Sequence, residues 1–485
     1  MSYTCAGARG RTGGVTVTVM SFIGEVRYDG WMRWAPLLLC LFACGHHHPY
    51  DATDAKPDLD APPCVGLSCQ INTTCPGGGH TTISGTVWAP NGTLPLYDAT
   101  VFVPTTTPDP FPVGVSCDRC NNPVSGGPIA IAVTGADGTF SLVDVPSGKN
   151  IPLVIQLGRW RRQVVIPEVA ACTDTPVTDV ELTRLPKNHN EGDIPQMAIA
   201  TGGADPFECL LLKLGIDPQE ITAPQEGGRV HFYTATDAPG TDLATPAPRA
   251  DQLYGSLSTL VKYDVVLLPC EGGPHDKSVV DGNALPTDPR LALSQYVDLG
   301  GRVFTTHYSY DWLTYPGSQY NQLASPLGGD GGWPVEQTDD FNRTIAGNIL
   351  VTFDKGAAFA DWLRFAGATS PAGSLDINQG RHDVTGVNPE FVRPWVTYDF
   401  NTVGGGPGVM HFTFNTPLHP PVDSTGAPQY CGRVVFSDFH VTTNAIANAS
   451  LPFPAACATD PMTDQEKALA FMLFDLSSCV ANELQ

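Results

Sequence analysis

The sequence is poor in basic residues and has no long hydrophobic run. Only 26 of its 485 residues are Lys or Arg, against 49 Asp or Glu, which gives a formal net charge of −23. So acidic a surface repels phosphate backbones, and we therefore expect no nucleic-acid partner. No apolar stretch reaches the ~20 residues of a membrane-spanning helix. The chain also lacks an HExxH zinc motif, a GxGxxG fingerprint and a P-loop lysine. We accordingly predict no cofactor and assign no metal ligand.

Cysteine, by contrast, is plentiful, with 14 residues spread along the chain. Cytosolic proteins seldom hold so many without metal-ligand spacing. Here Cys117 and Cys120 form the one close pair, and no second pair completes a zinc site. The count therefore favours an exported, oxidised protein. Because eleven cysteines follow Cys44, at least one thiol stays free unless a disulfide joins two molecules.

The one notable apolar stretch has the layout of a secretory signal. From Met32 the sequence reads MRWAPLLLCLFACG, in which Arg33 precedes the apolar residues 35–43 and Cys44 follows them. This layout resembles a bacterial lipoprotein signal. The resemblance implies that Cys44 is lipidated and becomes the mature N-terminus, so that the membrane is contacted through a lipid anchor only.

The segments around Cys44 are interpreted on the same basis. Residues 1–43 are predicted to be a mis-called extension plus the signal peptide, and residues 44–78 a flexible tether rich in Asp, Ala and Pro. Gly45 after the cysteine resembles the pattern of proteins sent to the outer membrane. The predicted location is the cell envelope, as an outer-membrane lipoprotein or a secreted protein. The tether also holds three adjacent histidines whose metal binding would be incidental, namely His46, His47 and His48.

Residues 79–187 are predicted to form a small antiparallel β-sandwich. Short alternating stretches such as ISGTVWAP, ATVFVP and IPLVIQLG are separated by turn residues, and no helical period appears. ISGTV and TGADGTFSLVDVPSG resemble the carboxypeptidase regulatory-like, or transthyretin-like, domain, which implies a spacer or binding module. Within this segment GRWRRQ holds Arg159, Arg161 and Arg162, a basic spot that either docks a carboxylate or forms a solvated strand edge.

Residues 188–485 are predicted to form a doubly wound α/β domain with a parallel sheet. Strand-like QMAIAT, RVHFYT, YDVVLLPCEGG and GGRVFTTHY alternate with helical stretches, including residues 249–261 and 288–299 and a helix that Asp205 is expected to cap. On YDVVLLPCEGG, GGRVFTTHY and GRVVFSDFH, the order resembles the flavodoxin-like class I glutamine amidotransferase superfamily, including its trehalose-utilisation-like branch. The chain is also similar to surface lipoproteins of myxobacteria. That superfamily places a nucleophilic cysteine at the turn where this chain has Thr306, His307 and Tyr308, so the resemblance does not imply glutaminase chemistry.

The carboxyl ends of the strands are the expected site, because ligands of open α/β sheets bind there. His307, His440 and Asp438 are the candidate catalytic residues, since a histidine oriented by a carboxylate is a general base. Two histidines with carboxylates also suit a divalent metal. The candidate ligand-binding residues are Thr201, Gly202 and Gly203 after the first strand, Glu271 after the third, and Tyr308 and Asp311 after the fourth.

Strand order also suggests disulfide partners. The first and third strands are neighbours in a flavodoxin-like sheet, so we predict a disulfide between Cys209 and Cys270. Alternatively, Cys270 is a nucleophile with His440 as its base. CDRC lies in a loop flanked by Pro and Gly, which favours a structural role, with Cys172 as a candidate partner. The other predicted bridges are local ones among Cys64, Cys69 and Cys75 and among Cys431, Cys457 and Cys479.

These observations favour a non-catalytic envelope lipoprotein that binds a small polar ligand, a glycan or a partner protein. The alternative is a secreted hydrolase that acts through the histidines and carboxylates of the strand ends. A third possibility is a purely structural surface module, in which those side chains only satisfy backbone groups.

Overall fold

The structure is a computed structural model that describes Cys64 and residues 66–120, 122–235, 241–273, 275–280, 283–314, 317–325, 343–400, 406–441 and 445–482. Cys44, the predicted signal and the first part of the predicted tether lie outside the described residues. Residues 63–485 form one compact unit. Within the described part we find no helix with the length and hydrophobicity that a membrane span requires.

The last part of the segment expected as a tether is fastened to the first sheets. A disulfide joins Cys75 to Cys172. The Asn72 side-chain amide donates a hydrogen bond to Ser147 Oγ at 2.8 Å. The chain therefore becomes ordered before residue 79, because covalent and polar contacts hold it there. Two short 3₁₀ helices lie in this stretch, Gly66–Gln70 and Pro76–Gly78.

Two small sheets follow, as the alternating sequence predicts. One has the order β4-β1-β7 and the other β3-β2-β5-β6. The antiparallel prediction fails at one pair, because β7 returns to run parallel to β1. The segment GADG between β3 and β4 links strands of different sheets, since β3 pairs with β2 and β4 with β1. The elements are β1 (Thr82–Thr86), β2 (Thr100–Pro104), β3 (Pro128–Val133), β4 (Thr139–Val143), β5 (Gly148–Leu157), β6 (Trp160–Val169), β7 (Asp174–Val177) and α1 (Val180–Thr183).

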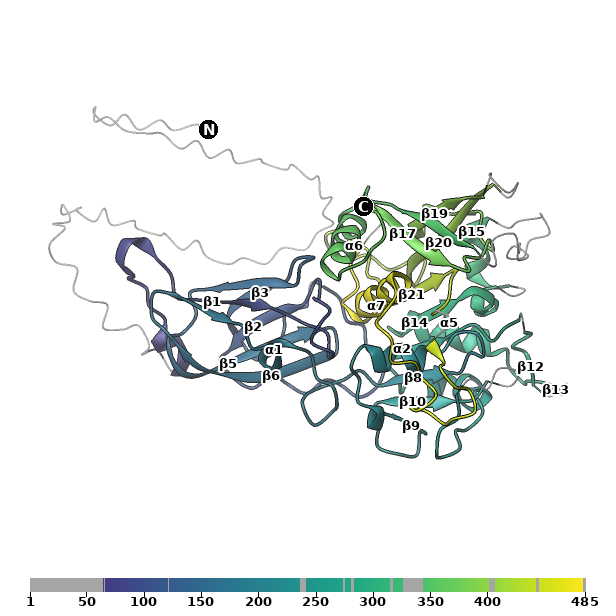
Figure 1. Cartoon of the computed structure of the whole chain (residues 1–485), viewed down its shortest axis with the longest axis horizontal. Coiled ribbons are helices and arrows are strands. Elements are labelled where there is room, and N and C mark those ends of the chain that lie inside the picture. Colours follow the sequence, from purple (N-terminus) through teal and green to yellow (C-terminus); the bar gives the residue numbers. More distant parts are fainter. Residues whose placement is uncertain are drawn as a thin grey trace, which may run out of the picture. The chain divides into compact units, whose positions relative to one another are not determined.

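A ten-stranded mixed sheet dominates the rest of the chain (Figure 1). Its order is β17-β16-β19-β20-β21-β14-β11-β8-β10-β9. The strands are β8 (Met197–Ala200), β9 (Ile221–Thr222), β10 (Val230–Tyr233), β11 (Val265–Leu268), β14 (Arg302–Thr306), β16 (Thr344–Ile349), β17 (Ser374–Asn378), β19 (Val392–Asp399), β20 (Pro407–Thr416) and β21 (Gly432–Ser437). Two small ribbons pair β12 (Val279–Val280) with β13 (Asn283–Ala284), and β15 (Ala324–Ser325) with β18 (Gly386–Val387).

The prediction of a parallel sheet holds for one half of this sheet only. The strands from β9 to β21 in the spatial order are parallel. Numbered along the chain from β8, the strands β10-β8-β11-β14-β21 follow the order 2-1-3-4-5 of doubly wound flavodoxin-type sheets. From β20 onward every pair is antiparallel. The hydrophobic pattern of β20 predicts a strand but carries no information about its direction.

Helices cover both faces of the parallel half, because its strands are apolar on both sides. In β11, Val265 and Leu267 belong to one core and Val266 and Leu268 to the other. The first core also holds α2, α6, α7 and the small sheets, and the second holds α3, α4 and α5. The predicted helix at 249–261 is broken into two single turns. The helices are α2 (Phe207–Lys213), α3 (Asp251–Tyr254), α4 (Leu257–Leu260), α5 (Pro289–Asp298), α6 (Asp354–Phe365) and α7 (Asp464–Ser477).

The disulfides differ from most of the predicted pairs. Cys209 bonds with Cys457, their Cα atoms 5.3 Å apart, and not with Cys270, which is a buried free thiol. The predicted pairing was wrong because Cys270 lies beyond the end of β11 and faces a histidine. The late cysteines do not bond with one another either, since two of them hold the loop that carries CDRC. The bridges are Cys64–Cys69, Cys75–Cys172, Cys117–Cys431, Cys120–Cys479 and Cys209–Cys457. Together they indicate an extracellular or envelope protein.

Candidate functional site

A sharp turn at the carboxyl end of β14 positions the central residue of the site. The strand ends at Thr306, and a 3₁₀ helix, His307–Trp312, begins at once. His307 has a φ of +42°, a left-handed conformation that is strained for a residue with a Cβ atom. This turn resembles the strand-to-helix elbows that present a side chain above the end of a sheet. Here the presented side chain is an imidazole.

Three side chains that the sequence assigned to separate strand ends meet at this turn. His307 Nδ1 lies 3.3 Å from Cys270 Sγ and 3.0 Å from His440 Nε2. Cys270 is fully buried, and the two histidines are 2% and 4% exposed. The structure therefore brings together both predicted catalytic histidines and adds a thiol beside them. We call these residues the Cys–His–His cluster.

Buried carboxylates surround this cluster. Asp383 Oδ2 lies 3.6 Å from His307 Nε2. The Asp383 N–H donates to Asp438 Oδ2 at 2.8 Å. Asp438, which was predicted to be catalytic, therefore contacts Asp383, the residue beside His307. Burial raises the pKa of Asp438. Sequence reasoning missed Asp383, because it follows β17 in the antiparallel half, where the strand-end rule does not apply.

Asp205 is a second residue whose role the sequence did not predict. It does not cap α2, whose N-cap is Pro206. Instead its carboxylate accepts the Val441 N–H at 2.7 Å and the Thr306 hydroxyl. Burial, which outweighs these hydrogen bonds, raises the pKa of Asp205 to about 7. The same strand-end rule that selected Thr201 could have found Asp205, four residues further along the chain.

Burial also sets the protonation of the Cys–His–His cluster in the absence of a bound ion. It raises the pKa of the Cys270 thiol to about 12. It lowers the pKa of His440 well below its usual value. The thiol is therefore protonated at neutral pH, and His440 is a neutral imidazole. A protonated thiol is a poor nucleophile.

The other predicted ligand-binding residues have identifiable contacts. Thr201 Oγ1 accepts the Ala235 N–H at 2.9 Å. Gly202 is buried, and a Cβ atom there would lie 2.6 Å from the Cys270 carbonyl oxygen, so only glycine fits. Gly203 next to it is exposed. Tyr308 packs on the His307 ring with centroids 3.8 Å apart.

The two acidic residues of the predicted rim lie around a buried lysine. Glu271 forms an ion pair with Lys277 at 3.0 Å. Asp311 Oδ2 accepts the His275 N–H at 2.6 Å, and burial raises the pKa of Asp311 to about 6. The Lys277 ammonium lies 5.4 Å from the centre of the Trp312 ring. These contacts within the chain occupy the carboxylates of Glu271 and Asp311, which were predicted to bind a ligand.

A cavity of about 530 Å³ lies at the opposite, amino-terminal end of the parallel strands. It is bounded by the residues that begin β8, β10 and β11 and by the loop at 110–114. That volume is typical of small-molecule sites. No sequence pattern predicted this cavity, because the rule for open α/β sheets points to the other end of the strands. Its lining includes Phe111, Gln196, Arg229, His231, Lys262 and Tyr263.

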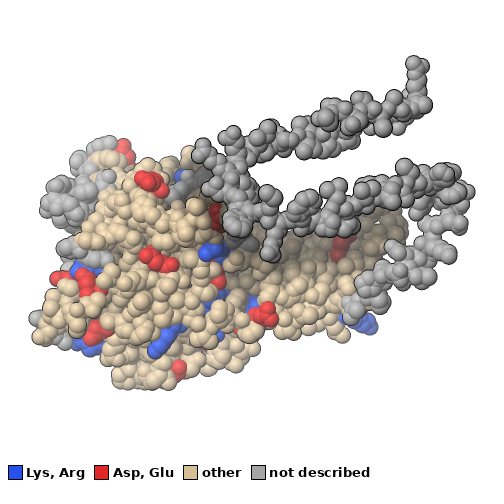
Figure 2. Space-filling view, turned by 180° about the vertical axis from the view of Figure 1, so that it is seen from behind, with Lys and Arg blue, Asp and Glu red and all other residues tan. Residues whose placement is uncertain are grey.

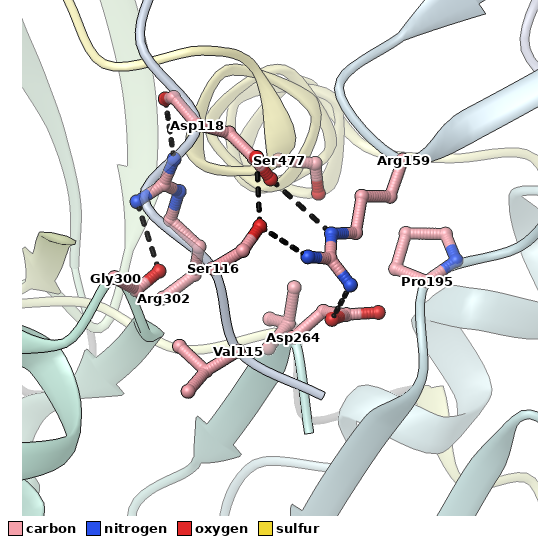
Figure 3. A pocket seen from close by; sticks show the side chains of 10 residues that line it. Val115, Ser116, Asp118, Arg159, Pro195, Asp264, Gly300, Arg302 and Ser477 are labelled. Atoms are coloured by element: carbon pink, nitrogen blue, oxygen red, sulfur yellow. Dashed lines mark hydrogen bonds and ion pairs between the residues drawn. The ribbon is translucent and has the colours of Figure 1, made fainter. Parts of the chain in front are cut away.

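Arg159 holds the loop against the beginning of β11, as Figure 3 shows. Its guanidinium lies 2.6 Å from Asp264 Oδ1 and donates to the carbonyl oxygens of Pro112 and Gly114 at 2.9 and 2.8 Å. It also pairs with Asp118 at 3.2 Å. Arg161 similarly pairs with Asp193 at 2.9 Å. Arg159 and Arg161 therefore dock carboxylates of the chain itself, and Arg159 lines the cavity.

A polar network forms the floor of the cavity. The Tyr263 hydroxyl lies 2.8 Å from both His231 Nδ1 and the Tyr233 hydroxyl. Arg229 donates to Gln196 Oε1 at 3.2 Å. Its Nε atom is buried and has no hydrogen-bond partner among the described residues. Burial lowers the pKa of His231, so the ring is neutral at pH 7.

Two cationic groups of the cavity are not neutralised. Within the described part of the chain, neither Arg229 nor Lys262 forms an ion pair with a carboxylate. The face of the molecule in Figure 2 carries acidic and basic side chains in small separate groups. The cavity lining holds Arg159, Arg229 and Lys262 beside the carboxylates of Asp193 and Asp264, in a chain of net charge −23.

Comparison with known proteins gave similarities of fold only. No protein-family model matches the chain, and no curated protein matches its sequence. Among solved structures, a β-galactosidase from Rahnella sp. R3 is 13% identical with a TM-score of 0.27, over 58% of this chain and 31% of that chain. A ThuA-like protein from Parabacteroides merdae is 13% identical with a TM-score of 0.26, over 50% of this chain and 77% of that one. This chain thus spans about a third of the β-galactosidase, and we draw no functional conclusion from either similarity.

Proposed function

We propose that this protein is a non-catalytic binding protein of the cell envelope that holds a small anionic ligand in the cavity at the amino ends of β8, β10 and β11. The observation that carries the proposal is the cavity of about 530 Å³ with Arg229 and Lys262 unpaired by any described carboxylate. An anionic group is the natural partner of such cations. Phe111 and Tyr263 offer apolar surface for the rest of the ligand.

The contrast with the rest of the chain supports this choice of ligand. Arg159 and Arg161 each contact a carboxylate at short range. Arg229 is half-buried and forms no ion pair with a described carboxylate, so a bound anion would give it the kind of partner that Arg159 and Arg161 find in the chain itself. A cavity of about 530 Å³ has the size of a small-molecule site, which favours a small molecule over a glycan or a partner protein.

The test is to purify the full chain from its native envelope, extract the bound small molecules and identify them by mass spectrometry. We expect an anionic compound in the wild type, and at least about tenfold less in the double variant Arg229→Ala/Lys262→Ala, because each lost charge-assisted contact costs about 1.5 kcal/mol or more. Lys149→Ala, an exposed lysine of β5, serves as the control and should retain the compound. Equal amounts of every compound in wild type and double variant would contradict the proposal.

The alternative function, a secreted hydrolase, has one observation in its favour. His307, His440 and Cys270 lie within hydrogen-bonding distance, and Asp383 is placed to orient His307. The near-complete burial of these residues and the raised pKa of the thiol count against it. Turnover of p-nitrophenyl esters that is lost in His307→Gln, with the fold retained, would revive this alternative.

We also propose that the parallel half is a degenerate amidotransferase-like domain following a carboxypeptidase regulatory-like domain. The strand order and the elbow that carries His307 in place of a cysteine support this relationship. Lipidation at Cys44 stays a prediction from the signal layout. Palmitate labelling of the wild type and its loss in Cys44→Ala would support the anchor, and an unlabelled wild type would refute it.

A further inference from the structure

The Cys–His–His cluster has the composition and spacing of a metal-ligand set. One ligand atom from each of Cys270, His307 and His440 lies within 4.8 Å of the others. Around a tetrahedral zinc ion, nitrogen ligands lie about 3.4 Å apart, and sulfur and nitrogen about 3.6 Å apart. The observed separations of 3.0 Å and 3.3 Å from His307 Nδ1 therefore need to change by only a few tenths of an ångström.

The surroundings of the cluster supply what metal ligands require. A ligating histidine usually contacts a carboxylate through its other ring nitrogen. His307 is oriented for this arrangement, with Nδ1 toward the other two ligands and Nε2 at 3.6 Å from Asp383 Oδ2. The Gly272 N–H donates to Cys270 Sγ at 3.4 Å, a contact that stabilises a thiolate. Because Gly272 itself is exposed, the buried Cys270 sulfur lies close to the protein surface.

Charge at the site is consistent with a bound cation. A thiolate and two neutral imidazoles around a divalent ion leave one positive charge, and the carboxylate of Asp383 is there to balance it. Two further buried carboxylates, Asp205 and Asp438, lie close by, against one buried guanidinium, that of Arg381. Sulfur and imidazole donors select Zn²⁺ or Cu⁺ over Mg²⁺ or Ca²⁺.

We propose that Cys270, His307 and His440 bind one thiophilic transition-metal ion, Zn²⁺ or Cu⁺, at the carboxyl end of the parallel sheet. On binding, the thiol proton passes to solvent and the sulfur forms a metal–thiolate bond. Three protein ligands leave a fourth position of a tetrahedral site for water or another small ligand. This site is separate from the cavity proposed to hold the anionic ligand, and either can exist without the other.

The proposal is tested by metal loading of the full chain. His46, His47 and His48 are replaced by alanine in every protein compared, so that the predicted tether contributes no ligands. The purified protein is incubated with excess Zn²⁺, desalted and analysed by inductively coupled plasma mass spectrometry. Cu⁺ is offered in a parallel arm under anaerobic conditions. We expect an equimolar amount of one of the two ions in the reference protein, which carries these three alanines and leaves Cys270, His307 and His440 unchanged.

Variants separate this site from adventitious binding. Cys270→Ser and His440→Gln should each lower the affinity at least about a hundredfold, and Asp383→Asn about tenfold, because it removes only the orienting carboxylate. His411→Gln is the matched control, since His411 is buried in the same sheet but hydrogen-bonded to Ser437. Binding that is undiminished in Cys270→Ser would overturn the proposal, as would a reference protein that retains neither ion.

A second measurement needs no variant. The wild type is partially opened in mild denaturant and treated with N-ethylmaleimide, and alkylation of the Cys270 peptide is measured by mass spectrometry. We expect a bound ion to protect Cys270 from alkylation. Cobalt-loaded protein should also show a thiolate-to-cobalt charge-transfer absorption band. Equal alkylation with and without the ion, together with the absence of that band, would refute the site even if the variants failed to fold.

Discussion

The two ends of the parallel sheet are built for different occupants. At the carboxyl end, Cys270, His307 and His440 are almost fully buried, and their ligand atoms lie within 4.8 Å of one another. At the amino end, the loop at 110–114 stands away from the strands and encloses about 530 Å³. The difference shows that a connection inserted far away in the sequence can create a molecule-sized site where the usual rule for α/β sheets expects none.

Covalent and ionic contacts hold that loop in place. Directly after residues 110–114, the disulfides Cys117–Cys431 and Cys120–Cys479 join the loop to the C-terminal part of the chain. Arg159 joins it to the sheet. At the carboxyl end, the polar side chains of Cys270, His307 and His440 face one another. The predictions below test these two arrangements.

The largest effect is expected from Arg159→Ala at the amino end. The substitution leaves the half-buried Asp264 and Asp118 without their guanidinium partner. Removing one member of such a pair costs about 3–5 kcal/mol, so we expect the free energy of unfolding to fall by that order. Chemical denaturation measures it. Arg364→Ala is the control, because the exposed pair of Arg364 with Asp361 should contribute less than about 1 kcal/mol. Equal losses in the two variants would contradict this role of Arg159.

An intermediate effect, dependent on pH, is expected from Asp205 at the carboxyl end. The pKa of Asp205 is about 7 in the folded protein and about 4 in the unfolded chain. Between these values the folded state binds more protons, so the stability contributed by the protonated group is present below pH 4 and is lost as the pH rises to 7. Over that window the free energy of unfolding should fall by at most about 4 kcal/mol from this group.

The measurement is denaturation at a series of pH values in wild type and Asp205→Asn. An amide imitates the neutral carboxyl, so the variant should lose stability less steeply with rising pH. Asp276→Asn is the control, because the pKa of the exposed Asp276 is lowered by hydrogen bonds to Ser278, and its removal should not flatten the wild-type slope in this window. Identical slopes in wild type and Asp205→Asn would contradict the assignment.

The smallest effect is expected from Tyr263→Phe, again at the amino end. The loss of one hydroxyl removes its contacts with His231 and Tyr233, both 2.8 Å long. We expect a decrease of about 1–2 kcal/mol in the free energy of unfolding, because two buried groups lose a partner. Thermal denaturation measures it. Tyr296→Phe, whose hydroxyl has one close partner at 3.1 Å, should cost less. A larger loss in Tyr296→Phe would show that the network adds little.

The sequence predicted the positions of helices and strands well, but it predicted the disulfide partners and the strand directions poorly. Most strands of the parallel half were located from their apolar runs, and α5 lies within the helix predicted at residues 288–299. His307 and His440 were selected together because strand ends converge. The partners of Cys209 and Cys270 were assigned wrongly, since a disulfide depends on which side chains meet after folding. The direction of β20 and the position of Asp383 were missed for the same reason.

By itself the sequence determined the alternation of strands and helices, the residues that cover both faces of the sheet, the exported character implied by the cysteines, and the residues at the strand ends. These follow from local hydrophobic period and turn chemistry. Only the tertiary structure decided that Cys270 faces His307 and that the loop at 110–114 encloses a cavity beside Arg229 and Lys262. Both arise from contacts between residues far apart in the chain, which no local pattern encodes.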